Sequence, residues 1–181
     1  EPVVNRGMAL VGAGPVLLVV DDGWASAPDW RLRQSAMTDI VDEAERQGRP
    51  LRVLTTAPPP DGRPLAPSGL LRAGEARELI HSLAPKPWPV DRAAAEAALE
   101  MADVAGPVQT IWLSDGLEGL GGAATTMTMV ERLQRIGPLR LMAPPAEDLA
   151  KALARPRNEG AALVITAIRA IAATEAGRAP A

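Results

Sequence analysis

The sequence predicts an α/β protein with a doubly wound, mostly parallel sheet and a β-hairpin extension at its C-terminal end. Short runs rich in Val, Leu and Ile alternate with longer segments in which apolar residues recur every three to four positions. This alternation is typical of parallel strands joined by helices on both faces of a sheet. The first run is apolar at every position and stops at an Asp-Asp-Gly turn, as expected of a strand buried on both faces.

The predicted elements follow one another in a regular order. The first strand is expected over residues 15–20, and a helix follows it over residues 31–47 and ends at Gly48. The remaining elements are, in chain order, a strand at 51–56, a proline-rich surface loop at 57–70, helices at 73–83 and 92–103, a strand at 108–113, a helix at 125–135 and a strand at 138–142. Right-handed crossovers would make the strands at 15–20 and 108–113 neighbours in the centre of the sheet.

We expect two parts, an α/β domain over residues 1–143 and an extension over residues 144–181. A chain of 181 residues has room for one such domain and an appendage, but would be cramped for two domains. In the extension, the run LVITAIRAIA is compatible with a helix or a strand, and we favour the strand. Residues 151–155 and 162–172 would then pair through a turn at 158–160, as a hairpin that begins a second β domain.

Composition excludes several classes of function. The chain has no Cys, which rules out disulfides, thiolate metal sites and cysteine nucleophiles. Its aromatic residues are four Trp, and its net charge is -3, so neither the stacking platform nor the basic surface of a nucleic-acid-binding protein is expected. The longest apolar run, residues 8–20, is interrupted by Gly and Pro and is too short to span a bilayer.

Carboxylates follow the two strands that we expect at the centre of the sheet. Asp21 and Asp22 come directly after the first strand, and Asp115 comes after the strand at 108–113. The carboxyl ends of parallel strands meet at one edge of the sheet, where open α/β sheets bind their ligands. Carboxylates brought together there would repel one another, raise a pKa or hold a hard cation such as Mg²⁺. The alternative is that each is a turn residue or a helix cap.

These residues also carry a family resemblance. The segment VLLVVDDGWASAPDWRLRQ, followed much later by IWLSDG, resembles the von Willebrand factor A (VWA) domain, which has a Rossmann-like fold. With PKPWP at residues 85–89, the motifs look more specifically like the VWA segment of bacterial membrane proteins of the aerotolerance-regulator (Bat-like) type. The resemblance covers residues 14–143.

The family's metal-ion-dependent adhesion site uses a first Asp, two Ser hydroxyls, a Thr from a middle loop and a later Asp. By the resemblance, Asp21 and Asp115 take the two Asp positions, whereas Gly23 and Ala25 stand where the two Ser would be. The adhesion site therefore looks degenerate. No cofactor is expected to be required, and Mg²⁺ held by Asp21, Asp115 and waters would bind weakly.

Other alignments with the family pattern do not restore the site. Counting the motif from Asp22 places Trp24 and Ser26 at the hydroxyl positions and recovers one hydroxyl. The connector at residues 85–92 contains no Thr, and only Asp91 offers a side-chain oxygen there. Asp91 is also well placed as the N-cap of the following helix.

Catalytic arrangements find less support. His81 is the only His and lies in the helix at 73–83, away from the strand ends, so a Ser-His-Asp triad is not expected. The glycine loops that bind phosphates lack their signatures. The enzymatic alternative is a Mg²⁺-dependent phosphoryl-transfer enzyme in which Asp21 or Asp22 is the nucleophile and a metal ligand.

The tryptophans point toward a binding module. Trp24 and Trp88 lie in loops near the carboxyl ends of the strands, where they would form a partner-binding surface with Ser26 and Asp91. The alternative is that the two rings close the top of a sheet that has no Phe or Tyr, while Trp112 lies in the core. We interpret the chain as a non-enzymatic protein-interaction module.

The resemblance also implies a cellular setting. The chain begins Glu1-Pro2 and is interpreted as a fragment whose parent is anchored in a bacterial membrane by segments outside this chain. By the resemblance, the domain lies on the periplasmic side and works with a MoxR-type AAA ATPase or with other Bat-like membrane proteins. The absence of Cys is compatible with the periplasm and with the cytoplasm.

Overall fold

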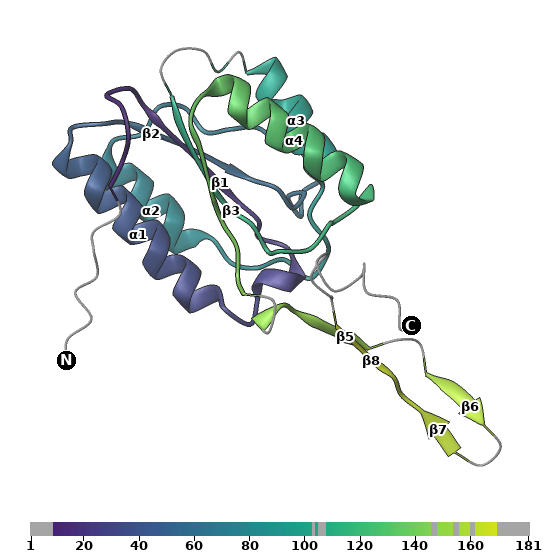
Figure 1. Ribbon diagram of the computed structural model, residues 1–181. Coiled ribbons are helices and arrows are strands. Elements are labelled where there is room, and N and C mark those ends of the chain that lie inside the picture. The colour runs from purple at the N-terminus through teal and green to yellow at the C-terminus, as the bar shows by residue number, and fades with distance from the viewer. Residues whose placement is uncertain are drawn as a thin grey trace, which may run out of the picture.

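The computed structural model describes residues 9–102, 104, 108–145, 148–153, 156–159 and 162–169. Its centre is a four-stranded parallel sheet with the order β2-β1-β3-β4 (Figure 1). The strands are β1 (Val16–Val20), β2 (Leu51–Thr55), β3 (Gln109–Leu113) and β4 (Leu139–Met142). β1 and β3 pair along their whole length, which confirms the predicted adjacency of the two central strands.

Helices cover both faces of the sheet. α1 (Trp30–Arg46) and α2 (Ala73–Ser82) lie on one face, and α3 (Arg92–Met101) and α4 (Gly122–Ile136) lie on the other (Figure 1). A short 3-10 helix, η1 (Trp24–Ser26), follows β1. This arrangement is a doubly wound, Rossmann-like α/β fold, and the predicted fold class is confirmed.

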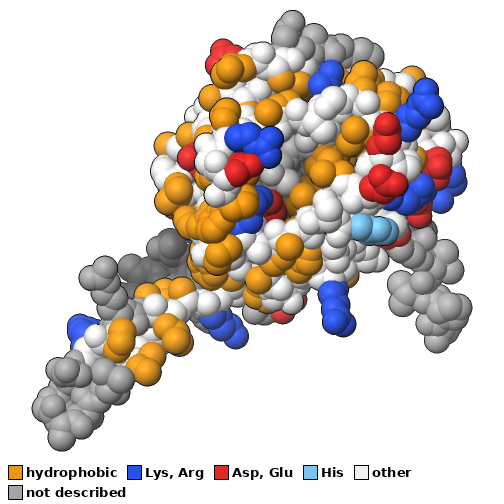
Figure 2. Space-filling view, turned by 180° about the vertical axis from the view of Figure 1, so that it is seen from behind, with side chains coloured by type: hydrophobic (Ala, Val, Ile, Leu, Met, Phe, Trp, Pro, Cys, Tyr) orange, Lys and Arg blue, Asp and Glu red, His pale blue; other side chains and the backbone are white. Residues whose placement is uncertain are grey.

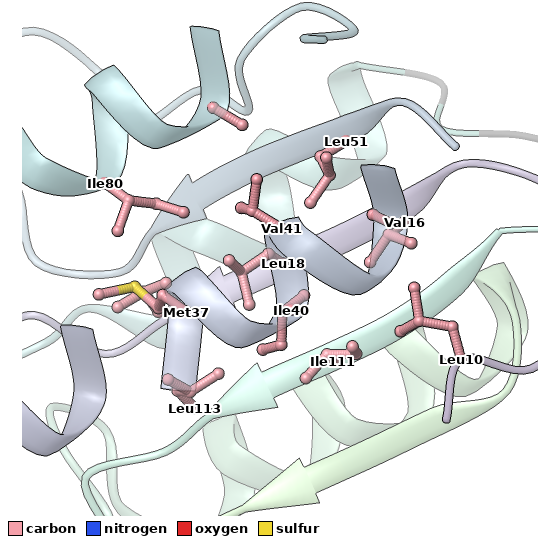
Figure 3. Close-up of a cluster of buried hydrophobic side chains, with 13 residues drawn as sticks. Leu10, Val16, Leu18, Met37, Ile40, Val41, Leu51, Ile80, Ile111 and Leu113 are labelled. Carbon is pink, nitrogen blue, oxygen red and sulfur yellow. The ribbon is translucent and has the colours of Figure 1, made fainter. Parts of the chain in front are cut away.

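The two-sided burial of β1 explains its unbroken apolar sequence. Val16, Leu18 and Val20 belong to the cluster on the α1 and α2 face, whereas Leu17 and Val19 belong to the cluster on the α3 and α4 face. All five side chains are fully buried, so no position of the strand tolerates a polar residue. Figure 3 shows how side chains of α1, α2 and three strands meet in the first cluster: Met37, Ile40, Val41, Leu51, Ile80, Ile111 and Leu113.

The proline-rich segment after β2 forms no helix or strand, as predicted, and it protects the edge of the sheet. The backbones of Leu51 and Leu71 exchange two hydrogen bonds, and the amide of Ser68 donates to the carbonyl of Val53 at 2.8 Å. These contacts satisfy backbone groups of β2 that would otherwise be open to another strand.

The C-terminal extension contains two antiparallel strand pairs that project away from the sheet (Figure 1). β5 (Lys151–Leu153) pairs with β8 (Ala167–Arg169), and β6 (Arg157–Glu159) pairs with β7 (Ala162–Val164). The strand interpretation is therefore confirmed for residues 151–153, 162–164 and 167–169, whereas residues 165 and 166 belong to no strand. The turn predicted at 158–160 is wrong at its start, because Asn158 and Glu159 belong to β6; Gly160 and residues 170–172 lie outside the described residues.

The extension exposes apolar side chains on its surface. Leu153, Ile165 and Ile168 are each more than half exposed, and hydrophobic side chains are visible along this arm in Figure 2. The strands of the arm are three residues long, and β5 and β6 pair with β8 and β7, respectively. Among the helices that the structure describes, none combines the length and the hydrophobicity needed to cross a membrane.

Candidate functional site at the carboxyl end of the sheet

Asp21 and Asp115 meet at the carboxyl ends of β1 and β3. The amide of Asp21 donates to the carbonyl of Leu113 at 2.9 Å, which continues the strand pairing by one residue. The amide of Asp115 donates to Oδ2 of Asp21 at 3.1 Å. Both Asp residues are buried, and their carboxylates lie side by side as the adjacency of the strands predicts.

A guanidinium group lies between the two carboxylates. Nη2 of Arg92 donates to Oδ2 of Asp21 at 2.7 Å and to Oδ1 of Asp115 at 2.8 Å. The side chain of Arg92 is fully buried, and its Cζ lies 5.2 Å from the centre of the Trp112 ring. Ion pairing and a cation–π contact therefore compensate for moving the arginine out of water.

Local backbone structure delivers Arg92 to this position. Asp91 is the N-cap of α3, as predicted, with its carboxylate accepting from the amide of Ala94 at 2.9 Å. The carboxylate of Asp91 is thus engaged in the cap, and the side chain of the next residue, Arg92, reaches the carboxylate pair. Gly119, at a φ of 69°, lets its loop close over the guanidinium, because a Cβ there would lie 2.8 Å from Val90 Cγ2 and 3.3 Å from Arg92 Nη1.

Each oxygen of the Asp21 carboxylate accepts two hydrogen bonds. Oδ1 accepts from the hydroxyl of Thr56 at 2.7 Å and from Nε1 of Trp112 at 3.1 Å. Oδ2 accepts from Arg92 and from the amide of Asp115. Because each oxygen accepts two hydrogen bonds, this side chain is held firmly in place by the surrounding fold.

The carboxylate of Asp115 accepts fewer hydrogen bonds than that of Asp21. Its Oδ1 accepts from Arg92 and from the amide of Leu117, at 2.9 Å. Burial raises the pKa of Asp115 above its ordinary value, and the nearby Asp21 carboxylate adds to this effect, while Arg92 opposes it. The positive charge of Arg92 therefore favours the ionised form of Asp115.

Asp22 makes a separate set of contacts. Its Oδ1 accepts from the amide of Ala57 at 2.9 Å, and its Oδ2 accepts from the ammonium of Lys86. The amide of Lys86 also donates to the carbonyl of Asp22 at 2.7 Å, which fastens the loop before α3 to the end of β1. Burial raises the pKa of Asp22 and outweighs the opposing effect of Lys86.

A second buried arginine closes the end of β3 from the other side. Nη2 of Arg33, in α1, donates to the carbonyl of Ser114 at 2.7 Å, and its Nε donates to Asp29 at 2.8 Å. A cavity of about 340 Å³ lies beside it, between the start of α1 and the ends of β3 and β4, with mostly apolar walls that include Leu32 and Met142. Arg33 and its ion-pair partner Asp29 both line this cavity.

The loops of Trp24 and Trp88 are joined at the same end of the sheet. The amide of Trp24 donates to the carbonyl of Trp88 at 3.1 Å. Gly23 makes this close approach possible, because a Cβ there would lie 2.9 Å from that carbonyl oxygen. Both Trp side chains are half-buried, and Nε1 of Trp88 donates to the carbonyl of Pro58 at 2.9 Å.

The other residues singled out from the sequence lie elsewhere. Ser26 is fully buried, with its hydroxyl donating to the backbone carbonyl of Asp21, so its side chain is not on the surface. Asp91 is half-buried as the cap of α3. Trp112 lies in the core, as predicted. His81 is exposed on α2 (pale blue in Figure 2).

The arrangement does not fit a metal ion. Within the described residues, no three His, Asp or Glu side chains are grouped as metal ligands. The space between Asp21 and Asp115, where the sequence suggested weakly held Mg²⁺, is filled by the guanidinium of Arg92. Its positive charge and its volume both oppose a second cation there.

Sequence reasoning missed the residues that compensate the carboxylates, which are Arg92, Arg33, Lys86 and Thr56. Arg92, Lys86 and Thr56 are each separated from the carboxylate that they contact by tens of residues along the chain, and no local pattern marks them as its partners. The spacing of Asp29 and Arg33, four residues apart on a helix, was the one available signal.

Comparison with known proteins adds no family to this description. No protein-family model matches the chain, and no curated protein matches it at a significant level.

Proposed function

We propose that this chain is a non-enzymatic, VWA-like protein-interaction module of a membrane-anchored bacterial protein. In this proposal it binds a protein partner through the loops at the carboxyl ends of its strands. The observation that carries the proposal is that the carboxylates a catalytic site would need are already bound by other groups of the chain. Asp21 and Asp22 are both fully buried and ion-paired.

These contacts favour the interaction module over the phosphoryl-transfer enzyme. A nucleophilic carboxylate must reach a substrate phosphorus, and a metal-binding carboxylate must have a free oxygen. Oδ1 and Oδ2 of Asp21 each accept two hydrogen bonds already, and both oxygens of Asp22 are bonded. Enzymatic use of either residue would require breaking buried ion pairs in each catalytic cycle.

The loops of Trp24 and Trp88 are suited to binding. Half-buried tryptophans offer a large apolar contact area, and such residues often dominate the energy of protein interfaces. The hydrogen bond between the two loops and the anchoring of Trp88 to Pro58 hold both residues in place before a partner arrives. A surface fixed in advance loses less entropy on binding.

The partner follows from the family resemblance. A protein of the MoxR-type AAA ATPase system, or another Bat-like membrane protein, is the candidate, with the domain on the periplasmic side of the membrane. No nucleic acid and no cofactor take part in the proposed function, and contact with the membrane would be made by segments other than this chain.

The test compares partner capture with hydrolysis. The wild-type chain, Trp24→Ala and Asp21→Asn are used to capture proteins from a membrane extract, and the same three are assayed for phosphatase activity. We expect Trp24→Ala to weaken capture of a specific partner by about 30-fold, which is on the order of 2 kcal/mol, with an unchanged circular dichroism spectrum.

Met101→Ala is the matched control, because Met101 is also apolar and is exposed at the end of α3. It should leave capture unchanged. Phosphatase activity that Asp21→Asn abolishes, together with full capture by Trp24→Ala, would favour the enzyme over the interaction module.

A further inference from the structure

The carboxylates of Asp21 and Asp115 are bound by the same buried nitrogen of Arg92. Nη2 of Arg92 lies within 2.8 Å of an oxygen of both Asp21 and Asp115, and all three side chains are nearly or fully inaccessible to water. Two buried carboxylates so close together require a positive charge, supplied by a proton, an arginine or a metal ion. In this protein the positive charge belongs to the chain itself.

Every hydrogen-bond partner of Arg92 is an oxygen atom. Besides the two carboxylates, Nη1 donates to the carbonyl of Leu117 and, at 3.1 Å, to the hydroxyl of Thr126. Nε has no partner among the described residues. Two carboxylates, a carbonyl and a hydroxyl are the kinds of ligand that Ca²⁺ and Mg²⁺ take in proteins, with waters completing the shell.

The same contacts connect four parts of the fold. Asp21 directly follows β1, Asp115 comes shortly after β3, Leu117 lies in the loop before α4, and Thr126 lies in the first turns of α4. A divalent ion bound by these oxygens would tie the same segments together. The arginine therefore does at this edge of the sheet what a bound metal ion does elsewhere.

We propose that Arg92 is a resident cation that takes the place of a divalent metal ion, and that its guanidinium masks a latent site for Ca²⁺ or Mg²⁺. The ligands of the latent site are the oxygens that Arg92 now contacts, on Asp21, Asp115, Leu117 and Thr126. The wild-type chain is consequently independent of divalent ions. If the proposed interaction function holds, chelators do not affect partner binding.

The experiment uses Arg92→Ala and needs no partner, so its outcome is separate from that of the proposed function. Thermal unfolding is followed by circular dichroism in EDTA and with CaCl₂ or MgCl₂ at matched ionic strength. The wild-type midpoint should be the same in all three conditions. Arg92→Ala should unfold at a lower temperature in EDTA and should gain about 3–6 °C when the ion is at ten times its dissociation constant.

Three further variants make the result specific. Arg33→Ala removes another buried arginine, but one that contacts two carbonyls and a single carboxylate, and it should not respond to either ion. Arg92→Met removes the charge while filling the space, and it should be destabilised without a response. In Arg92→Ala combined with Asp115→Asn, the response should be lost.

If Arg92→Ala does not fold in EDTA, refolding with added ions tests the proposal instead. Recovery of a soluble, folded monomer on refolding with Ca²⁺ or Mg²⁺ would support the latent site. The proposal is overturned if Arg92→Ala has the same midpoint with and without the ions, if neither ion restores folding, or if Arg33→Ala responds equally.

Discussion

Arg92 and Arg77 each contact two carboxylates, in opposite surroundings. Arg92 bridges Asp21 and Asp115, with side-chain exposures of 0%, 0% and 4%. Arg77 of α2 bridges Asp42 and Glu45 of α1, with exposures of 31%, 42% and 55%. Figure 2 shows acidic and basic side chains next to one another on the surface of the globular part. Both clusters join one guanidinium to two carboxylates, and they differ most in how far water reaches these groups.

Water decides what each cluster contributes. At the surface, solvent and salt screen the charges, and either partner of Arg77 can be replaced by water. At the end of the sheet no water is available, so removing one member leaves the others as unpaired buried charges. The fold therefore depends on the buried cluster, which fixes how the ends of β1 and β3 are arranged. The surface cluster adds a contact between α1 and α2 that the fold can lose.

The largest effect is expected from Asp21→Ala. The substitution leaves Arg92 with a single carboxylate and removes the acceptor of Thr56 and Trp112, so we expect a loss of about 3–5 kcal/mol in the free energy of unfolding. Urea unfolding followed by tryptophan fluorescence measures it. Asp61→Ala, at an exposed ion pair, is the control and should behave as wild type. Equal effects of the two substitutions would contradict the comparison.

An intermediate effect is expected in the pH dependence of stability, with opposite signs for a buried and an exposed carboxylate. Burial raises the pKa of Asp22 above its ordinary value of 3.8, so its contribution is largest in acid and is lost as pH rises through the folded-state pKa. Hydrogen bonds from the backbone and side chain of Arg63 lower the pKa of Asp61 below 3.8. Its contribution is present above 3.8 and is lost as pH falls.

The free energy of unfolding is measured from pH 3 to 7 for the wild type, Asp22→Asn and Asp61→Asn. This range brackets the ordinary Asp pKa. Each variant is then subtracted from the wild type to give one series. Relative to Asp22→Asn, the wild type should become less stable as pH rises above 3.8. Relative to Asp61→Asn, it should become less stable as pH falls below 3.8. If relative stability changed in the same direction with pH in both series, burial would not be what sets the pKa of Asp22.

The smallest effect is expected from Arg77→Ala. Its ion pairs with Asp42 and Glu45 are partly exposed to solvent, so the change in the unfolding midpoint should be far smaller than that of Asp21→Ala. The change should also disappear near 1 M NaCl, where the screening length falls to about 3 Å. The effect of Asp21→Ala should persist there. A loss of stability for Arg77→Ala that survives high salt would mean that its alkyl chain, and not its charge, joins α1 to α2.

Much of the fold could be predicted from local hydrophobic patterns, because the tertiary contacts agree with them. The apolar run at β1 requires burial on both faces, and the helical period of α1 supplies the layer that covers one of them. The turn predicted at Asn158 was placed too early, because the polar sequence there pairs as β6. In such a short hairpin, cross-strand pairing decides the register, and composition alone does not.

The sequence by itself determined that Asp21 and Asp115 would meet, because parallel strands joined by right-handed crossovers bring the carboxyl ends of β1 and β3 together. Only the tertiary structure decided what lies between them. An arginine at the first position of a helix is ordinarily solvated, and nothing near Arg92 in the sequence marks it as buried. Its partners lie 71 and 23 residues away, so the ion pairs exist only once the sheet, α3 and the loop before α4 have packed together.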